Sequence, residues 1–417
     1  MNPVSALYGA VARARRSRYA RHPDRRRHLH RPVISVGNLV VGGSGKTPVV
    51  AAVARLLTEA GERPVILSRG YKRRERGRDP LIVSDGARVL ATVEQSGDEP
   101  QMLARSLPGV PVVVSPDRHA SGLLAESRLQ PTVFLLDDGF QHLRLARDID
   151  LLVIGAADLE ESLLPSGRLR EPLSAARAAD ALLVRGSDED VRRVSAAAAV
   201  ATAFRLDMIY DSPGSVGDRG ARLSGSPREP EGFAPQQSSD GRLRVVVVAG
   251  IARPERFVAA VREQGCEIVR EIVFRDHHWF TDADVARIER AAVETGADAV
   301  ITTEKDAVRL EMFLAGPASA AAEAMADESP EPALRTAIHA VRRPGSAHAV
   351  RRPGSAHAVR RPGSAQAVRR PGSAERTRQT NLPWLVLPMR VSIEPASAFR
   401  SWLMARLATA RATESPA

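Results

Sequence analysis

The sequence predicts an α/β fold: a mostly parallel sheet covered by helices on both faces, with a second, smaller α/β domain. Between Pro32 and about Arg205, short apolar runs of strand length alternate with segments of helical periodicity. That alternation is typical of a doubly wound sheet. A second alternation begins at Leu243, after a stretch rich in Gly, Pro and Ser, and it predicts the second domain.

The individual elements follow from these runs. In the first domain we expect strands at residues 33–36, 64–68, 110–114, 133–136, 150–154 and 181–184. Helices are expected between them, at 47–60, 99–107, 116–126 and from Arg170 onward. In the second domain we expect strands at 243–249, 267–273, 297–302 and 384–387, and helices at 254–264, 282–295, 304–313 and 396–410. Ligands of such sheets bind at the carboxyl ends of the strands.

A glycine-rich loop follows the first expected strand and precedes the first helix. Its glycines allow backbone N–H groups to surround phosphate oxygens, and Lys46 would reach the β- and γ-phosphates of a nucleotide. Val40 stands where the usual pattern has its first glycine. We therefore expect a P-loop fold that binds a nucleoside triphosphate through Val40, Val41, Gly42, Gly43, Ser44, Gly45, Lys46 and Thr47.

An acidic pair marks the end of another expected strand. Asp137 and Asp138 follow the apolar run 132–136, where P-loop enzymes hold Mg²⁺. With Thr47 they form the expected metal site. Because neighbouring strand residues point to opposite faces, one aspartate should face the metal and the other Lys46 or a water. The sequence does not decide which is which.

The net charge of +11 comes mostly from one segment. Residues 339–374 are four copies of a nonapeptide with two arginines each, and without these eight the balance is 52 − 49 = +3. A Pro-Gly pair in every copy prevents a continuous helix, so we expect a disordered insertion. We favour the interpretation that this insertion has no function over the alternative that it is a basic tether for anionic lipid. Aromatic residues make up only 4% of the chain, and we expect no nucleic-acid binding.

The first residues form a basic amphipathic segment. Val4, Leu7, Tyr8 and Val11 fall at helical spacing, and eight arginines follow within 13–27. Such a helix can lie in a membrane interface, or it can dock on the protein; the residues alone do not choose. The single cysteine, Cys266, fits a reducing compartment.

These observations divide the chain into five parts. The expected divisions are 1–31 (basic segment), 32–210 (P-loop domain), 211–243 (linker or hairpin), 244–315 with 383–412 (second domain) and 316–382 (insertion).

Several motifs, taken in order, resemble the tetraacyldisaccharide 4′-kinases of lipid A synthesis. The likeness covers roughly residues 5–315 and resumes near 383–395. Beyond the loop at 36–48, it rests on Ser68–Tyr71, Gly97–Pro100, Asp137–His142, Leu164–Pro172, Phe274–His278 and Thr302–Asp306. Seven motifs in one order make the resemblance specific.

The resemblance implies a function and a set of site residues. It implies transfer of the γ-phosphate of ATP to the 4′-hydroxyl of a tetraacyldisaccharide 1-phosphate. It makes Asp98 and a histidine, taken as His277 with His278 left open, the catalytic pair that acts with Lys46. Contacts to this lipid A precursor are expected from Arg69, Tyr71, His142, Arg168, Arg170 and Glu171.

The resemblance also implies a place in the cell. The enzyme would be peripheral, at the cytoplasmic face of the bacterial inner membrane, with the N-terminal segment on its anionic surface. We infer no obligate protein partner.

Two alternatives remain open at this point. A P-loop GTPase or metallochaperone would share the architecture, although the guanine-reading pattern Asn-Lys-x-Asp is matched only loosely by residues 303–306. A basic nucleic-acid-binding protein would explain the arginines but not the loop.

Overall fold

The computed structural model describes residues 2–43, 45–75, 77, 79–216, 242–314 and 382–414. Ser44, most of the expected linker and, apart from Leu382, the whole expected insertion with its repeats lie outside these residues. The chain forms two compact units, Met1–Phe313 with Leu382–Ala417 and Leu314–Asn381. Of the second unit only Leu314 is described.

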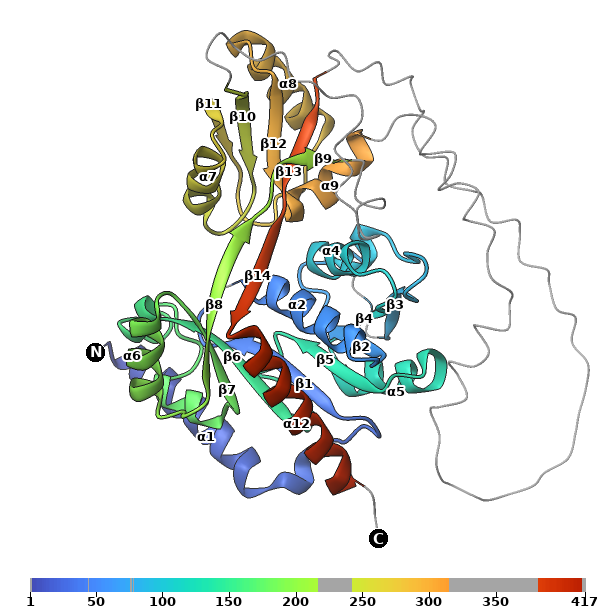
Figure 1. The fold of residues 1–417 in the computed structure, drawn as a ribbon, viewed down its shortest axis with the longest axis vertical. Helices are drawn as coiled ribbons and strands as arrows, with labels where there is room; N and C mark the ends of the chain where they lie inside the picture. The colour runs from blue at the N-terminus through green and yellow to red at the C-terminus, as the bar shows by residue number, and fades with distance from the viewer. Residues whose placement is uncertain are drawn as a thin grey trace, which may run out of the picture. The chain divides into compact units, whose positions relative to one another are not determined.

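A nine-stranded, mostly parallel sheet forms the centre of the first domain (Figure 1). Its strands are β1 (Val33–Asn38), β2 (Pro64–Ser68), β3 (Leu81–Ser84), β4 (Val112–Val114), β5 (Val133–Asp137), β6 (Ile149–Gly155), β7 (Ala181–Arg185), β8 (Ala203–Tyr210) and β14 (Met389–Glu394). Their order is β14-β8-β7-β6-β1-β5-β2-β4-β3. Only β14 with β8 and β3 with β4 pair antiparallel. The order reverses beside β1, which places the loop after β1 at the switch point of the sheet.

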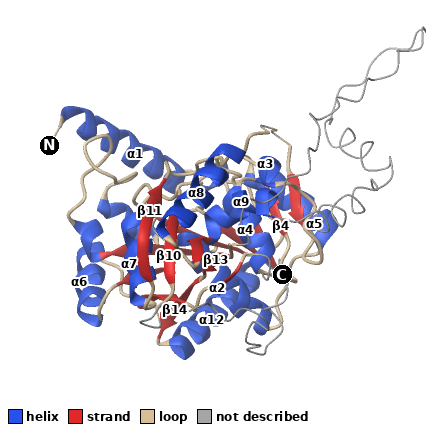
Figure 2. Ribbon diagram, turned by 90° about the horizontal axis from the view of Figure 1, so that it is seen from above, coloured by secondary structure: helices blue, strands red, loops and turns tan. Residues whose placement is uncertain are grey.

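Helices pack on both faces of this sheet, and Figure 2 labels them among the other elements. They are α2 (Lys46–Glu59), α4 (Asp98–Ser106), α5 (Arg118–Leu129), α6 (Asp188–Ala198) and α12 (Ala396–Glu414), with a short α3 (Val93–Ser96) before α4. Successive strand residues point to opposite faces. Ile34 therefore packs in the core beneath α2, α4 and α12, whereas Val33 packs in the core beneath α5. The expected α/β class is confirmed.

A five-stranded sheet forms the second domain. Its strands are β9 (Gly214–Ser215), β10 (Arg244–Ala249), β11 (Glu267–Val273), β12 (Ala299–Thr303) and β13 (Trp384–Leu387), in the order β11-β10-β12-β13-β9. Its helices are α7 (Pro254–Glu263), α8 (Asp282–Thr295) and α9 (Glu304–Leu314). α7 packs on one face through Phe257 and Val261, and α8 contacts β10, β11 and β12.

The chain crosses between the two sheets twice, which corrects the expected placement of residues 383–412. Only β13 belongs to the second sheet, because β14 pairs with β8 in the first (Figure 1). Phe399, Leu403 and Leu407 of α12 are buried in the core beneath the first sheet. The C-terminal segment therefore completes the P-loop domain.

The helix expected from Arg170 onward is also wrong. That segment contains only a 3₁₀ helix at Leu173–Ala178, and the next α-helix is α6. The residues before it are extended because they pair with the phosphate loop: the N–H of Arg170 donates to the carbonyl of Leu39 at 2.7 Å. Backbone used in that way is not available for helical hydrogen bonds.

The N-terminal segment is a helix, α1 (Pro3–Arg21), that docks through small residues. Ser5 Oγ donates to the carbonyl of Leu163 at 3.1 Å. A Cβ added at Gly9 would come within 2.5 Å of Leu163, so glycine permits the close approach. Val4, Leu7 and Val11 are 56%, 67% and 60% exposed. The described helices include none long and apolar enough to cross a bilayer.

Candidate active site

The loop between β1 and α2 has the backbone of a phosphate-binding loop. Gly42 and Gly45 have φ values of +84° and +78°, in the left-handed region that glycine adopts without steric cost. α2 begins at Lys46, directly after Gly45. The N–H groups of its first turn can therefore bind an anion held by the loop.

The valine in the first glycine position has a structural explanation. Val40 is 1% exposed and its backbone forms a β-bridge with Leu169. The neighbouring Val41 exchanges two hydrogen bonds with Arg168: the Val41 N–H donates to the Arg168 carbonyl at 2.9 Å, and Arg168 Nη2 donates to the Val41 carbonyl at 2.7 Å. The start of the loop is thus held by a second segment instead of by a tight glycine turn.

Lys46 lies among groups that fix the position of its ammonium. Its Nζ donates to Asn38 Oδ1 at 3.0 Å and lies 3.5 Å from Asp138 Oδ1. The other oxygen of Asp138 accepts from Arg170 Nη1 at 2.8 Å. Burial would raise the pKa of Asp138, but the charges of Lys46 and Arg170 outweigh it and lower the pKa below its usual value. Asp138 is therefore ionised, and it faces Lys46.

Asp137 points the other way and has the opposite electrostatics. It ends β5, is 3% exposed and accepts from Ser68 Oγ at 3.1 Å. Burial, followed by the charges of Glu99 and Asp138, raises the pKa of Asp137 to about 7. A cation bound nearby would favour its ionised form.

The carboxylates beside the loop fit a magnesium ion that is only partly held by the protein. Within the described part of the chain, Oδ1 of Asp138 is buried and accepts no hydrogen bond. Thr47 is the second residue of α2 and is half-buried. Groups of three or more His, Cys, Asp or Glu that could hold a metal do not occur among the described residues. Mg²⁺ typically takes one or two carboxylates, with phosphates and water as its other ligands.

Asp98 and His277 form a hydrogen-bonded pair. Asp98 is the first residue of α4, and its Oδ2 lies 2.8 Å from Nδ1 of His277. The two side chains are 5% and 8% exposed. Burial would raise the pKa of Asp98, but the hydrogen bond with His277 and the charge of Lys305 outweigh it and lower the pKa. At neutral pH the pair therefore contains an ionised carboxylate.

The neighbouring histidine has a different environment. His278 Nε2 lies 3.1 Å from Asp284 Oδ2, and its ring stacks on Phe274 with 4.6 Å between centroids. The structure thus brings His277, and not His278, to Asp98. Gly97, not Asp98, is the N-cap of α4.

The other expected substrate contacts lie at different distances from this pair. The Tyr71 ring meets the His277 ring edge-on, with 5.7 Å between centroids. Arg69 directly follows β2 and is exposed. Arg168 and Arg170 lie against the phosphate loop, as described above.

His142 lines a separate hollow of about 180 Å³. The other residues around that hollow are Arg27, Pro116, Asp117, His119 and Arg144, none of which belongs to the loop or the pair. Burial, then the charges of Arg118 and Arg147, lowers the pKa of His142 to about 4. His142 is thus neutral at physiological pH.

Glu171 does not fit the expected role of a substrate ligand. Its side chain is 6% exposed and is ion-paired with Arg16 of α1, with 2.5 Å between Oε2 and Nη2. Nε of Arg16 donates to the other carboxylate oxygen at 3.3 Å. Both oxygens are therefore occupied by a residue of the protein. Glu171 anchors α1 instead of facing the site.

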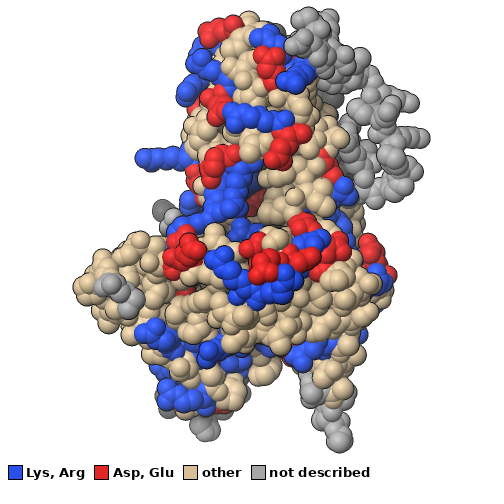
Figure 3. All heavy atoms as spheres, turned by 60° about the vertical axis from the view of Figure 1, so that its left-hand side comes forward, with Lys and Arg blue, Asp and Glu red and all other residues tan. Residues whose placement is uncertain are grey.

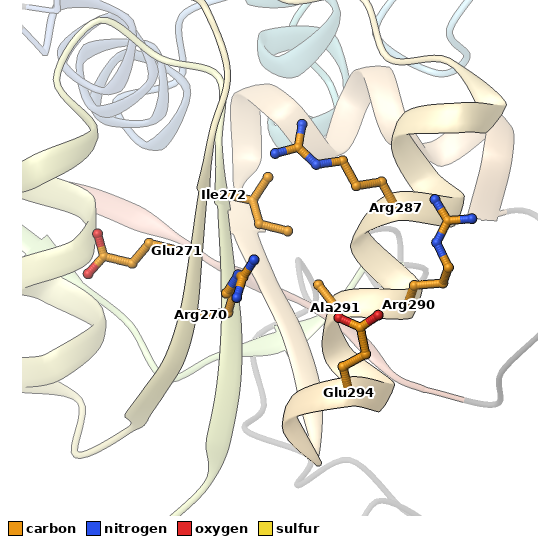
Figure 4. Close-up of a pocket in the computed structure, with 7 residues that line it drawn as sticks. All are labelled: Arg270, Glu271, Ile272, Arg287, Arg290, Ala291 and Glu294. Atoms are coloured by element: carbon orange, nitrogen blue, oxygen red, sulfur yellow. The ribbon is translucent and has the colours of Figure 1, made fainter.

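A second hollow, of about 200 Å³, lies between β11 and α8 (Figure 4). Arg270, Arg287 and Arg290 line it, together with Glu294. Glu271 extends away from it (Figure 4) and pairs with Arg262 of α7. No residue of the phosphate loop or of the Asp98–His277 pair lines this hollow, so the hollow is not the site of phosphate chemistry.

Three residues that contact predicted site residues received no role at the active site from the sequence. Asn38 holds Lys46, Arg16 holds Glu171, and Lys305 contacts His277. Asn38 and Lys305 stand within the motifs quoted above. Local spacing in the sequence does not single out Asn38, Arg16 or Lys305. Asn38 contacts Lys46 across the phosphate loop, and the other two contact residues that are distant in sequence.

The chain resembles known kinases over most of its length. A family model described as Tetraacyldisaccharide-1-P 4′-kinase matches residues 1–341. A tetraacyldisaccharide 4′-kinase of Geobacter sulfurreducens is 41% identical over 316 residues, 75% of this chain and 84% of the relative. Another, of Geobacter metallireducens, is 42% identical over 342 residues, 81% of this chain and 96% of the relative.

A solved structure shows the same fold. LpxK from Aquifex aeolicus, an "apo" form in complex with ATP, matches with a TM-score of 0.63 and 27% identity, covering 97% of this chain and 98% of that chain. The family match and the two relatives agree with the resemblance that the motifs carry, and this structure agrees with the fold. The chain belongs to the tetraacyldisaccharide-1-P 4′-kinase family.

Proposed function

We propose that this chain transfers the γ-phosphate of ATP to the 4′-hydroxyl of a tetraacyldisaccharide 1-phosphate in lipid A biosynthesis. The observation that carries the proposal is the Asp98–His277 pair beside a phosphate loop. A sugar hydroxyl is a poor nucleophile and needs a group to orient it and take its proton. Nucleotide hydrolysis by a GTPase needs no acceptor site of this kind, and family membership favours the kinase further.

The loop and Lys46 bind the triphosphate. Backbone N–H groups of the loop and of the first turn of α2 would surround the phosphate oxygens, and Lys46 would neutralise the β- and γ-phosphates. Asn38 and Asp138 hold the ammonium in place before ATP arrives. Preorganised charge of this kind needs little rearrangement during the reaction, which is why it lowers the barrier.

Mg²⁺ is the expected cofactor, held by Thr47 and Asp138, with Asp137 as the alternative carboxylate. The ion would neutralise charge that develops on the transferred phosphoryl group. Asp138 is the better candidate for direct contact because it is ionised and its Oδ1 is buried without a hydrogen bond from any described residue. Asp137 is turned toward Ser68, and we assign it a role in setting the local charge.

The Asp98–His277 pair positions the acceptor. Asp98 is ionised, and His277 holds its carboxylate through Nδ1. The hydroxyl would donate to this pair while its oxygen approaches the γ-phosphorus. Correct positioning supplies much of the rate enhancement in phosphoryl transfer. Asp98 comes from the P-loop domain and His277 from the second domain, so both are needed to complete the site.

Arginines near the loop are the proposed contacts of the anionic headgroup. Arg168 and Arg170 lie beside the phosphate loop, and Tyr71 lies against His277. Arg69, directly after β2, is the fourth proposed contact. Guanidinium groups bind phosphate in bidentate fashion, which suits a substrate with an anomeric phosphate. His142, in its separate hollow, is retained only as a candidate for a more distant part of the substrate.

The helix α1 is the proposed contact with the membrane. Its apolar side chains Val4, Leu7 and Val11 are exposed, while Ser5 and Gly9 face the protein. That arrangement supports the membrane reading of this segment over the docked one, because a helix that only docked would bury its apolar stripe. We propose a peripheral enzyme at the cytoplasmic face of the inner membrane, where a multiply acylated substrate resides.

A phosphate-transfer assay tests the proposal. Purified enzyme is incubated with γ-labelled ATP and the tetraacyldisaccharide 1-phosphate, and label in the lipid is measured. Label should appear in the lipid from γ-labelled ATP but not from γ-labelled GTP at equal concentration. Lys46→Ala should lower the rate of transfer from ATP by at least about 100-fold. Near-normal transfer by that variant, or label released only as inorganic phosphate, would contradict the function.

A further inference from the structure

Three arginines line the hollow between β11 and α8. Arg270 comes from the strand, and Arg287 and Arg290 come from the helix. We call these three residues the arginine cluster. All three are exposed, whereas Ile272 and Ala291, the apolar residues of the same hollow, are 5% and 7% exposed. Accessible positive charge therefore surrounds a space whose apolar lining is buried.

The strand places one arginine of the cluster on the side of α8. Successive strand residues point to opposite faces of a sheet. Arg270 and Ile272 therefore share the face that α8 covers, and Glu271 between them points to the other face. There Glu271 accepts a hydrogen bond from Arg262 of α7 at 2.7 Å. The acidic neighbour of Arg270 in sequence is thus bound elsewhere and does not neutralise it.

The helix contributes its part of the lining with helical period. Arg287, Ala291 and Glu294 are four and then three residues apart, and Arg290 stands beside them. Residues at these spacings lie on one side of a helix. The Arg287 side chain extends from α8 toward β11 (Figure 4). Because Ala291 has no side chain beyond Cβ, the longer side chains enclose an open space of about 200 Å³.

The arginine cluster has no partner among the residues that the structure describes. In that part of the chain, its guanidinium groups form neither a hydrogen bond nor an ion pair. Like charges one turn apart on a helix, as at Arg287 and Arg290, destabilise it. Arg270 adds a third positive charge from the strand. The cluster therefore lowers the stability of the folded chain as long as no anion neutralises it.

Exposed basic side chains are common on this protein, so charge alone does not define a site. Figure 3 shows Lys and Arg side chains across one face of the molecule, many of them next to Asp or Glu. Exposed arginines such as Arg192 and Arg193 are paired with glutamates. The arginine cluster differs from these because it has no described partner and because it gathers around one hollow from two elements.

We propose that the arginine cluster is a binding site for a phosphomonoester group. With Glu271 turned away (Figure 4), the hollow is lined by three guanidinium groups and the carboxylate of Glu294, a net charge of +2. A phosphomonoester carries about two negative charges at neutral pH, so the charges of site and ligand match. A guanidinium group can also donate two parallel hydrogen bonds to one phosphate.

The size and the lining of the hollow narrow the ligand further. Pockets for whole small molecules have volumes of about 300–1,000 Å³, and this hollow has about 200 Å³. It therefore accepts a phosphate group but not a complete nucleotide. Two sources supply such a group, a soluble ester and a lipid headgroup. Because Ile272 and Ala291 are buried, the lining offers no exposed apolar surface to acyl chains, and we assign the site to a soluble phosphomonoester.

Calorimetric titration of glycerol 3-phosphate into the full-length enzyme tests the site. Mg²⁺ and a non-hydrolysable ATP analogue are present at saturation, so that the phosphate loop is filled. We expect a Kd at or below about 1 mM. Changing all three members of the arginine cluster to Gln should weaken binding at least about 10-fold. The matched control removes the same charge at three other exposed arginines and should bind as the native enzyme does. It combines Arg128→Gln, Arg177→Gln and Arg256→Gln.

The acidic residue of the hollow provides a test in the opposite direction. Glu294→Gln removes the negative charge that lines the hollow and should tighten binding of glycerol 3-phosphate about 2- to 5-fold. Glu271→Gln makes the same change next to Arg270, but on the face where Arg262 binds the carboxylate, so it should change binding less. Both glutamates are exposed, and the two variants should fold normally.

Thermal unfolding supplies a second readout. Glycerol 3-phosphate should raise the Tm of the native enzyme and not that of the triple variant of the arginine cluster, because only a ligand bound to the folded state stabilises it. Without ligand, the triple variant should unfold at the same or a higher temperature than the native enzyme, since it has lost repulsion between like charges. A lower Tm would mean that the arginines stabilise the fold through internal contacts.

Vesicle sedimentation separates the two sources of phosphate. Vesicles of phosphatidylcholine with phosphatidic acid present a phosphomonoester headgroup at their surface. The triple variant of the arginine cluster should sediment with them as well as the matched control variant does. If the triple variant sediments less than that control, the headgroup is the ligand, and the assignment to a soluble ester is wrong.

Three results would overturn the site itself. They are equal binding of glycerol 3-phosphate by the native enzyme and the triple variant, equally tight binding of acetate, and unchanged or weaker binding in Glu294→Gln. The last of these requires no change in any arginine. None of them bears on transfer of the γ-phosphate, because no residue of the phosphate loop lines the hollow.

Discussion

Arg16 in α1 is bound to Glu171 by an ion pair with 2.5 Å between Nη2 and Oε2. The same guanidinium donates to the carbonyl of Phe140 at 3.2 Å and lies over its ring, 4.3 Å from the centroid. Phe140 belongs to the motif that follows Asp138, and Glu171 follows Arg170. The N-terminal helix is thus tied to both segments that line the phosphate site.

Breaking this pair should cost stability. Glu171→Gln leaves Arg16, whose side chain is only 16% exposed, without its charged partner. We expect the free energy of unfolding to fall by about 1–3 kcal/mol. Glu189→Gln, which breaks an exposed pair with Arg192, is the matched control and should change stability little. Urea denaturation measures both. The double variant Arg16→Met, Glu171→Gln should lose less than the sum of its single changes, and strict additivity would argue against a coupled pair.

The exposed side chains of α1 should bind membranes. Val4→Asp, Leu7→Asp and Val11→Asp together should weaken binding to anionic vesicles in a sedimentation assay. Val293→Asp changes a valine of α8 that is 62% exposed and should not. Each arginine near the surface adds roughly 1 kcal/mol of attraction, which falls off within about 8 Å at physiological salt. Salt should therefore weaken binding without abolishing it, because the apolar contribution is unscreened.

Two results would show that α1 is not the anchor. One is equal sedimentation of the triple variant and the native chain. The other is equal activity of the two on substrate in a bilayer. Deleting residues 1–30 is a harsher test, because it also removes Arg16.

The two adjacent aspartates should respond differently to metal. Asp138→Asn removes the ionised carboxylate that faces Lys46, so activity should fall and should recover in part as Mg²⁺ is raised. Asp137→Asn replaces a carboxyl that is turned toward Ser68, so its metal dependence should change less. Initial rates across a Mg²⁺ titration measure this. If the Mg²⁺ dependence changed more in Asp137→Asn than in Asp138→Asn, the proposed roles of the two aspartates would be exchanged.

Much of this fold follows from periodicity in the sequence. The runs at 64–68, 267–273 and 282–295 agree with β2, β11 and α8 to the residue, because each has a clear period and a turn or cap at both ends. β8 and β14 were missed although Phe204, Leu206 and Ile393 stand at alternating positions and are buried. Their pairing joins residues 203–210 to 389–394, which no local pattern indicates.

The site was predictable where the chemistry lies in one motif. The loop at 40–47 and Asp137–Asp138 are local, and strand order brings them together. The choice between His277 and His278 was not decided by the sequence, because it depends on His277 adopting a φ of +62°. Glu171 was misassigned because its partner Arg16 lies 155 residues away. Contacts at such separations come from tertiary packing.

Stability should depend on pH through His142. Its folded pKa of about 4 lies below the ordinary 6.5, with burial as the main cause. Between these values the unfolded chain binds a proton that the folded chain does not, so stability falls as pH falls from 6.5 to 4. The full effect is up to about 3 kcal/mol. His142→Gln should flatten this part of the curve in urea denaturation, and His22→Gln, at an exposed position, should not. An unchanged slope in His142→Gln would contradict the assignment.

The central claim, that Asp98 and His277 act as one unit on the acceptor hydroxyl, is tested most directly by single-turnover transfer from γ-labelled ATP to the lipid. Asp98→Ala and His277→Gln should each slow the chemical step by at least about 100-fold while ATP affinity stays within about 3-fold. The double variant should then be scarcely slower than the slower single variant. Losses that multiply fully in the double variant, or a near-normal rate in either single one, would contradict the account.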